Sequence, residues 1–432
     1  MFPIASTDAI KTTSYKIVLP FYIYAAVWFL IAAVMMFVRA EAFMNHFFHP
    51  HLLAITHIMA LGWATMVILG AAHQLVPVLI EGKLHSDRLA YATFILAALG
   101  IPLLVYGFYH FEMHAPAKWG GRFVILAVLC FLINIYKSMA KSKSENVHAV
   151  FVFTAILWLF ATVAFGLALV YNFTYTMFPH DYLHYLPLHA HTGIIGWFLL
   201  LVIGVGSRLI PMFMISKYTN PKLLWIIYLL INGALVIYLI IFYFFNKPGI
   251  TMVPSLLIML AVVLFIKYCY HAYKERLRKT VDEQIKISLL SVAMLLIPMI
   301  MLVILIGVFM TSASEKEKLS LVICYGFVIF FGWLTAIILG MTFKTLPFIV
   351  WNKVYHLQSA KGRTPNPKDL FSDVIFRIMS ISYLAGFVIF GSGILSEKSI
   401  LLQSGATLLI VAAFFYNWNV VKVITHKASI PS

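Results

Sequence analysis

Long apolar runs separated by short polar stretches recur along the whole sequence. A helix needs about 20 residues to cross a hydrocarbon layer of about 30 Å, and these runs reach or approach that length. We place them at 16–38, 51–80, 89–109, 122–140, 149–171, 187–215, 223–244, 249–270, 287–311, 319–350, 372–393 and 398–420. A segment in lipid must satisfy its backbone hydrogen bonds internally, and the runs do not alternate as barrel strands do. Each run therefore predicts a transmembrane helix.

The composition and the placement of charge support this reading. Charged residues make up 11% of the chain, against roughly 25% in a soluble domain, which excludes a soluble protein. The net charge of +16 comes from 31 Lys and Arg residues, of which only seven fall in the odd-numbered loops. These seven are Arg39, Lys118, Arg122, Lys247, Lys316, Lys318 and Lys398. The asymmetry predicts a bacterial-type inner membrane protein with both termini in the cytoplasm, in contact with lipid and without a nucleic-acid partner.

One short block of residues occurs three times, and we call it the Gly-Trp block. Its copies are Gly62-Trp63 with Gly70 and Pro77, Gly196-Trp197 with Gly204 and Pro211, and Gly332-Trp333 with Gly340 and Pro347. Successive copies are four predicted helices apart, so we expect one integral membrane domain of three four-helix repeats, 1–148, 149–286 and 287–432. Three like units favour a pseudo-threefold ring with the block-bearing helices inside. The glycines are also explained by close helix packing alone.

Most of the 16 histidines gather near the expected outer face. His57 and His191 each precede a Gly-Trp block by five residues, and the third equivalent is Phe327. A buried histidine often has only a structural hydrogen bond, but two imidazoles at equal depth on inner helices are what a six-coordinate haem iron requires. We therefore expect His57 and His191 to ligate a haem.

Three further histidines are candidate ligands. His189 lies two residues before His191 and about 200° around the helix, so it points into a different gap and is a second candidate for haem or metal. His180 and His184 flank Asp181 in the preceding outer loop. Imidazoles with a carboxylate suit copper or another transition metal, although such loops also occur without metal.

These residues resemble those of known families. The stretch Leu188-His189-Ala190-His191-Thr192-Gly193 through Trp197 resembles the His-x-His haem helix of the haem-copper oxidases, especially the C-type oxidases, and the segment around His57 resembles their second helix. A second resemblance, to the NnrS family of haem and copper membrane proteins, rests on the two histidine-bearing blocks and Ser207-Arg208. The resemblance implies haem b, a possible copper, a cytochrome or quinol electron donor, and a gas ligand, nitric oxide above oxygen.

The sequence also departs from the oxidase pattern. It has no His-His dipeptide, and its tenth predicted helix carries Tyr325, Gly326 and Phe327 where an oxidase has ligands. We expect an altered site in a haem protein that transfers electrons or handles a diatomic gas. The alternatives are a catalytic subunit of a terminal oxidase or nitric oxide reductase, and a transporter or haem-handling assembly factor.

A last shared position lies twelve residues after the glycine of each block, at Gln74, Arg208 and Lys344. Its two cations either extend to the headgroups or hold a buried anionic group at the cytoplasmic mouth.

Overall fold

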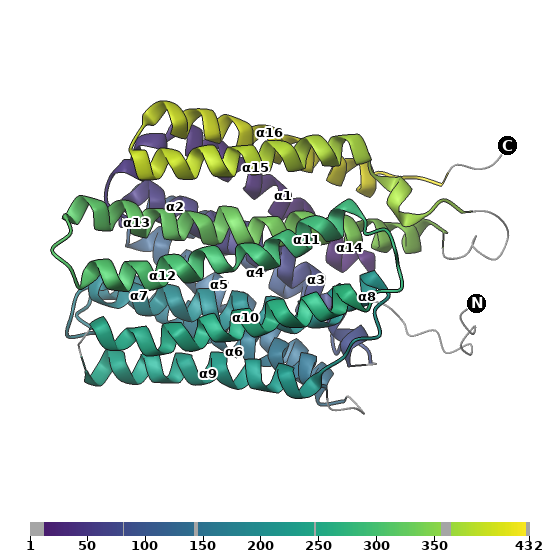
Figure 1. Ribbon diagram of the computed structural model, residues 1–432, viewed down its shortest axis with the longest axis horizontal. Coiled ribbons are helices and arrows are strands. Elements are labelled where there is room, and N and C mark those ends of the chain that lie inside the picture. The colour runs from purple at the N-terminus through teal and green to yellow at the C-terminus, as the bar shows by residue number, and fades with distance from the viewer. Residues whose placement is uncertain (1–12, 81, 142–145, 246–247, 356–363, 429–432) are drawn as a thin grey trace.

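The computed structural model describes residues 13–80, 82–141, 146–245, 248–355 and 364–428. In these residues it is all helical, and twelve helical stretches are long and apolar enough to cross a membrane. This confirms the predicted fold class. Nine of the stretches are α1 (Tyr15–Val38), α4 (Asp87–Tyr109), α5 (Ala115–Met139), α6 (Val147–Asn172), α9 (Pro221–Phe244), α10 (Met252–Lys274), α11 and α12 (Glu283–Met294 and Leu296–Phe309), α15 (Asp373–Ser396) and α16 (Ser399–Ile424). Helices run side by side along the long axis of the molecule (Figure 1).

The remaining three stretches carry the Gly-Trp blocks, and each contains a π-helical segment. They are α2, η2 and α3 (Pro50–His57, Ile58–Thr65, Met66–Leu79), α7, η3 and α8 (Tyr182–His191, Thr192–Leu199, Leu200–Met214), and α13, η5 and α14 (Glu315–Phe327, Val328–Leu334, Thr335–Tyr355). Between 72 and 83% of their most apolar window is buried, against 33–56% in the other nine. The block-bearing helices are therefore the inner ones. π-helices are rare and concentrate at functional sites.

The first glycine of the block is a packing position, as the simpler reading predicts. A Cβ added to Gly196 would lie 2.7 Å from Cγ of Trp158 on α6, and one added to Gly62 would lie 2.9 Å from Cγ of Trp28 on α1. Neither site has room for a side chain, so glycine lets the inner helix approach its neighbour.

Hydrogen bonds between tryptophan and threonine connect the inner helices of different repeats. Nε1 of Trp63 donates to Oγ1 of Thr335 over 3.2 Å, and Nε1 of Trp197 donates to Oγ1 of Thr65 over 3.1 Å. Both threonines stand two residues after a block tryptophan. The first repeat thus bonds to the third, and the second to the first, through the same pair of positions.

The third bond of this series is missing. Nε1 of Trp333 is buried and has no hydrogen-bond partner, and the residue of the second repeat that corresponds to the two threonines is Leu199. Two of the three equivalent hydrogen bonds are formed, and each joins one repeat to the repeat that would precede it in a ring. They favour the predicted ring of three repeats, which stays a prediction.

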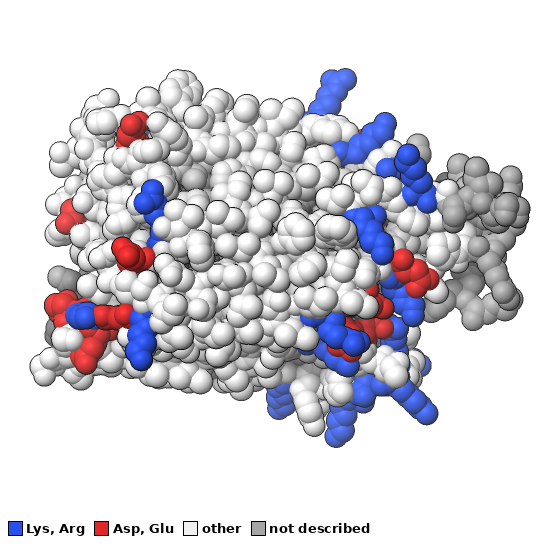
Figure 2. Space-filling model, turned by 90° about the horizontal axis from the view of Figure 1, so that it is seen from above, with Lys and Arg blue, Asp and Glu red and all other residues white. Residues whose placement is uncertain are grey.

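The end of the bundle with the chain termini in Figure 1 carries most of the Lys and Arg side chains (Figure 2). There Lys344, on the inner helix α14, forms an ion pair and hydrogen bond with Asp282, which also pairs with Arg278 over 2.7 Å. Burial tends to raise the pKa of Asp282, but its hydrogen bond to Lys344 and the two positive charges lower it overall. Lys344 thus holds an anionic group, as one of the two readings predicts, whereas Arg208 is exposed.

Candidate functional site

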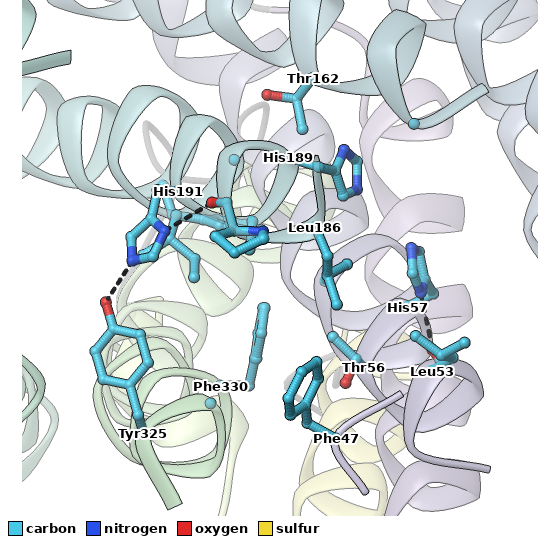
Figure 3. Close-up of a pocket in the computed structure, with 18 of the residues that line it drawn as sticks. Phe47, Leu53, Thr56, His57, Thr162, Leu186, His189, His191, Tyr325 and Phe330 are labelled. Atoms are coloured by element: carbon cyan, nitrogen blue, oxygen red, sulfur yellow. Dashed lines mark hydrogen bonds between the residues drawn. The ribbon is translucent and has the colours of Figure 1, made fainter. Parts of the chain in front are cut away.

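A cavity of about 690 Å³ lies among the inner helices, toward the end of the bundle opposite the basic one. Its walls are almost wholly apolar, and no Lys, Arg, Asp or Glu of the described chain lines it. His57, His189 and His191 all line it, together with Tyr238 and Tyr325 (Figure 3). The three histidines predicted as cofactor ligands therefore share one cavity, in surroundings that suit an uncharged or internally neutralised ligand.

His57 stands at the end of α2 with one ring nitrogen fixed. Its Nδ1 lies 2.8 Å from the carbonyl oxygen of Leu53, one turn earlier. Because a carbonyl can only accept, Nδ1 carries the hydrogen, and Nε2 keeps its lone pair. A hydrogen bond of this kind, from the ring nitrogen that does not face the metal, is how proteins orient a metal-binding imidazole.

His189, on α7, is the histidine that lies beside His57. The ring centroids are 6.4 Å apart and the ring planes differ by 17°. If a metal stood between two imidazole nitrogens at about 2.0–2.1 Å from each, the centroids would be about 6.3 Å apart. The spacing therefore fits one ion between the two rings.

Two details describe the surroundings of the His189 ring. Its Nδ1 is buried without a hydrogen-bond partner. Behind the ring, a Cβ on Gly166 of α6 would lie 2.7 Å from Cε1 of His189. The absent side chain at residue 166 is what leaves room for the imidazole in this position.

His191 faces a different gap. Its Nδ1 lies 2.7 Å from the carbonyl oxygen of Pro187, so Nε2 again keeps the lone pair, which the hydroxyl of Tyr325 approaches to 3.4 Å. The ring of Tyr238 lies 5.7 Å away. Figure 3 shows His191 turned toward Tyr325 and away from the two rings of His57 and His189. The neighbour of His57 is thus His189, and not the expected His191.

The predicted ring of three repeats would account for this exchange of partners. In a closed ring each unit meets the next through two different surfaces, so equivalent residues do not face one another. His57 and His191 are equivalent, and so are His189 and Tyr325. The contacts His57–His189 and His191–Tyr325 therefore join the same pair of repeat positions, and they fit the predicted ring, which stays a prediction. Tyr325 was seen in the sequence only as a missing ligand, and Tyr238 was not singled out.

The remaining candidate ligands lie outside the cavity. The rings of His180 and His184 are 4.3 Å apart, but Asp181 caps α7 by accepting the backbone N–H of His184 over 3.0 Å. His189 does not join them, since it lines the cavity with His57. Among the described residues no group of three or more His, Cys, Asp or Glu could hold a metal ion. Copper binding by His180 and His184 stays a prediction.

The histidines before α2 have a structural use. Nδ1 of His49 accepts the backbone N–H of His51 over 3.3 Å and so caps the helix. Burial and the positive charge of Arg39 lower the pKa of His49, which favours the neutral form that can accept this bond. Arg39 itself donates to the hydroxyl of Tyr109.

No protein-family model matches the sequence, and a comparison with curated proteins finds no match either.

Proposed function

We propose that this chain is a haem-binding integral membrane protein of the haem-copper oxidase-like superfamily, which transfers electrons or binds and turns over a diatomic gas, nitric oxide above oxygen. The observation that carries the proposal is the spacing of His57 and His189, two near-parallel imidazoles 6.4 Å apart in an apolar cavity. When bound, haem b would supply a redox-active iron at this position.

The donor set fits haem better than a bare metal ion. A protein zinc or copper site takes three or four ligands from the chain, whereas the described lining of this part of the cavity offers two imidazoles and neither carboxylate nor thiolate. Haem brings four nitrogens of its own and needs only axial ligands. A cavity of about 690 Å³ with apolar walls is also in the range of cofactor pockets.

The two histidines differ in how firmly they are held. The backbone carbonyl of Leu53 fixes the ring of His57, whereas Nδ1 of His189 has no partner. We therefore assign the permanent role to His57 and the exchangeable role to His189, and the nitric oxide measurement below tests this assignment. If both stay in place, the site is suited to electron transfer alone.

The position of the cavity adds an orientation. Because basic residues gather at the opposite end of the bundle, the positive-inside rule puts that end, with both termini, in the cytoplasm of a bacterial-type cell. The haem would then lie in the outer half of the membrane. A donor cytochrome or quinol would deliver electrons from that side.

The test is the absorption spectrum of the purified protein, oxidised and then reduced with dithionite. We expect a low-spin bis-imidazole spectrum that is lost or becomes high spin in His57→Ala and in His189→Ala and persists in His191→Ala. Unchanged low-spin spectra in both of the first two variants would refute the haem site. Loss in His191→Ala with retention in His189→Ala would restore the pair that repeat equivalence alone predicts.

A further measurement separates the two roles. If His189 is the ligand that leaves, the reduced His189→Gly variant should bind nitric oxide faster than the reduced wild type does. His57→Gly should lose haem. Equal rates in wild type and His189→Gly favour electron transfer.

A further inference from the structure

Two cations stand together at the end of the bundle opposite the basic one, and we call them the α5 cation pair. Lys118 and Arg122 lie one turn apart near the start of α5 and are two of the seven Lys and Arg residues in the odd-numbered loops. Like charges four residues apart on a helix are neighbours and repel. Among the described residues neither cation has a carboxylate partner, whereas Lys316 and Lys318, at the same end, each form an ion pair with a glutamate.

Aromatic and hydroxyl groups hold the pair in place without neutralising it. Nζ of Lys118 lies 5.2 Å from the ring centroid of Tyr171 on α6, and Cζ of Arg122 lies 5.6 Å from the same centroid. Nε and Nη2 of Arg122 both donate to the hydroxyl of Tyr171, and Nη1 has no hydrogen bond to a described residue. Nζ of Lys118 donates to the hydroxyl of Thr174 over 2.7 Å. All these partners are uncharged, so two positive charges over one ring remain open to an anion.

The start of α5 adds to the positive potential. The first N–H groups of a helix carry a partial positive charge of about half an elementary charge, which favours anions and disfavours cations nearby. The residue before the helix, His114, makes no side-chain capping hydrogen bond to these groups. Two side-chain cations beside the positive end of a 25-residue helix are therefore best explained by an anion that accompanies them.

The neighbours of the pair indicate a position at the lipid headgroups. Trp119, whose ring lies 4.5 Å from Cζ of Arg122, is 51% exposed, and Tyr175, whose ring lies 5.1 Å from Nζ of Lys118, is 59% exposed. Exposed tryptophan and tyrosine side chains are typical of the boundary between membrane and water.

The surface of α5 next to the pair suits acyl chains. Leu126 and Leu129 follow Arg122 by four and seven residues, so all three share one face of the helix. Both leucines are exposed, and they lie deeper along α5 than the cation. A ligand with an anionic head and apolar tails would therefore meet matching groups in the right order.

We propose that Lys118 and Arg122 bind the phosphate of an anionic phospholipid, with its tails along the face of Leu126 and Leu129. Arginine and lysine donate strong hydrogen bonds to phosphate oxygens, and Nη1 of Arg122 is available for this. A zwitterionic lipid would bring its own cation toward the pair, where the described residues offer no carboxylate to receive it. Phosphatidylglycerol, which has no amine, is therefore preferred over phosphatidylcholine. The site does not depend on the haem.

The test reads Trp119, which contacts Arg122. The purified protein is placed in phosphatidylcholine nanodiscs with rising fractions of lipid brominated in its acyl chains, and the quenching of Trp119 is the difference between each protein and its Trp119→Phe form. We expect half-quenching at an about tenfold lower fraction of brominated phosphatidylglycerol than of brominated phosphatidylcholine, which corresponds to about 1.4 kcal/mol. Lys118→Gln/Arg122→Gln should abolish this preference with the circular dichroism spectrum unchanged.

The matched control is Lys316→Gln/Lys318→Gln, which removes the same charge from the same end but from lysines that already have carboxylate partners. It should keep the wild-type preference, and so should Arg122→Lys. If the double variant of the α5 cation pair does not fold, Arg122→Gln alone should lower the preference about threefold, and equal effects of Gln and Lys at this position would overturn the proposal.

Three other outcomes would also overturn it. The first is equal quenching of the wild type by the two lipids, and the second is an unchanged preference in the folded Lys118→Gln/Arg122→Gln variant. The third is loss of the preference when inorganic phosphate replaces chloride at constant ionic strength, because the cations would then bind a free anion and not a lipid. Loss of the preference in the control variant would attribute it to the general charge of this end, which equally contradicts a site at Lys118 and Arg122.

Discussion

The cyclic contact between repeats predicts a difference among three equivalent tryptophans. Trp63, Trp197 and Trp333 are 0–2% exposed, so replacing any of them with Phe removes a similar apolar area. Their Nε1 groups differ, because the first two donate to Thr335 and Thr65 and the third has no partner. Trp333→Phe should therefore destabilise the protein least.

The expected difference follows from the hydrogen-bond energies. Trp63→Phe and Trp197→Phe each lose a bond with a net value of about 0.5–1.5 kcal/mol, whereas Trp333→Phe removes a buried donor whose lost hydration costs about 1–3 kcal/mol. The free energy of unfolding of Trp333→Phe should thus exceed that of the other two variants by roughly 2 kcal/mol. Thr65→Val adds a check, since it leaves Nε1 of Trp197 without an acceptor and should destabilise by about 1–3 kcal/mol.

Thermal unfolding in one detergent, followed by near-UV circular dichroism, measures the order. Trp333→Phe should have the highest Tm of the three, and the Trp197→Phe/Thr65→Val double mutant should show a coupling energy because the two side chains share a bond. A Tm for Trp333→Phe equal to or below that of Trp63→Phe and Trp197→Phe would refute the reasoning.

Two further predictions concern the His189 pocket and the basic end. Gly166→Ala should displace His189 and lower haem occupancy, measured as haem absorbance per protein. Gly233→Ala is the control: its added Cβ meets nothing within 4 Å, so it should leave the spectrum unchanged and stabilise the protein by about 0.5–1 kcal/mol. Equal effects of the two substitutions on haem absorbance would contradict the packing argument. The lowered pKa of Asp282 means that its contribution to stability is present above the usual carboxyl pKa of about 3.9 and is lost as pH falls through the folded value. Asp282→Asn should therefore lower the free energy of unfolding at pH 7 by about 1 kcal/mol, after allowance for solvent screening, and flatten the fall in Tm below about pH 4. An unchanged pH profile would exclude this role.

The sequence is a good guide to the twelve spans because apolar length is a local signal that lipid makes obligatory. The largest difference is α5, which begins at Ala115 and not near 122. Lys118 and Arg122 interrupt the apolar run, but in the structure their cations lie over aromatic rings at the helix end. The π-helical segments were not predicted, because they depend on how the inner helices meet.

The candidate site was predicted in its residues but not in its pairing. His57, His189 and His191 are rare polar residues in apolar helices, which makes them visible in the sequence. Their partners depend on how the inner helices meet in space, which a linear alignment of equivalent positions does not contain. Tyr238 is one of 22 tyrosines and follows no motif, so only the structure brings it to the cavity.

The third repeat shows what the position of His57 becomes without a polar residue. Phe327, the equivalent of His57 and His191, packs against Phe331, Phe387 and Phe390 with ring centroids 5.0–5.5 Å apart, and Phe390 meets Phe43 of the first repeat at 4.8 Å. These rings pack against one another, and Phe327 and Phe331 also line the cavity. Phe327→Ala should destabilise by about 3–5 kcal/mol, as for a buried Phe. It should leave the low-spin haem spectrum in place, because Phe327 carries no nitrogen that could ligate the iron.

His57→Ala, at the equivalent position, should lose the haem spectrum. When wild type and variant are compared without haem, His57→Ala should lower Tm less than Phe327→Ala does. The two variants together test whether one repeated position has diverged into a ligand and a packing residue. If Phe327→Ala abolishes the haem spectrum as fully as His57→Ala does, the assignment of separate roles to the two positions fails.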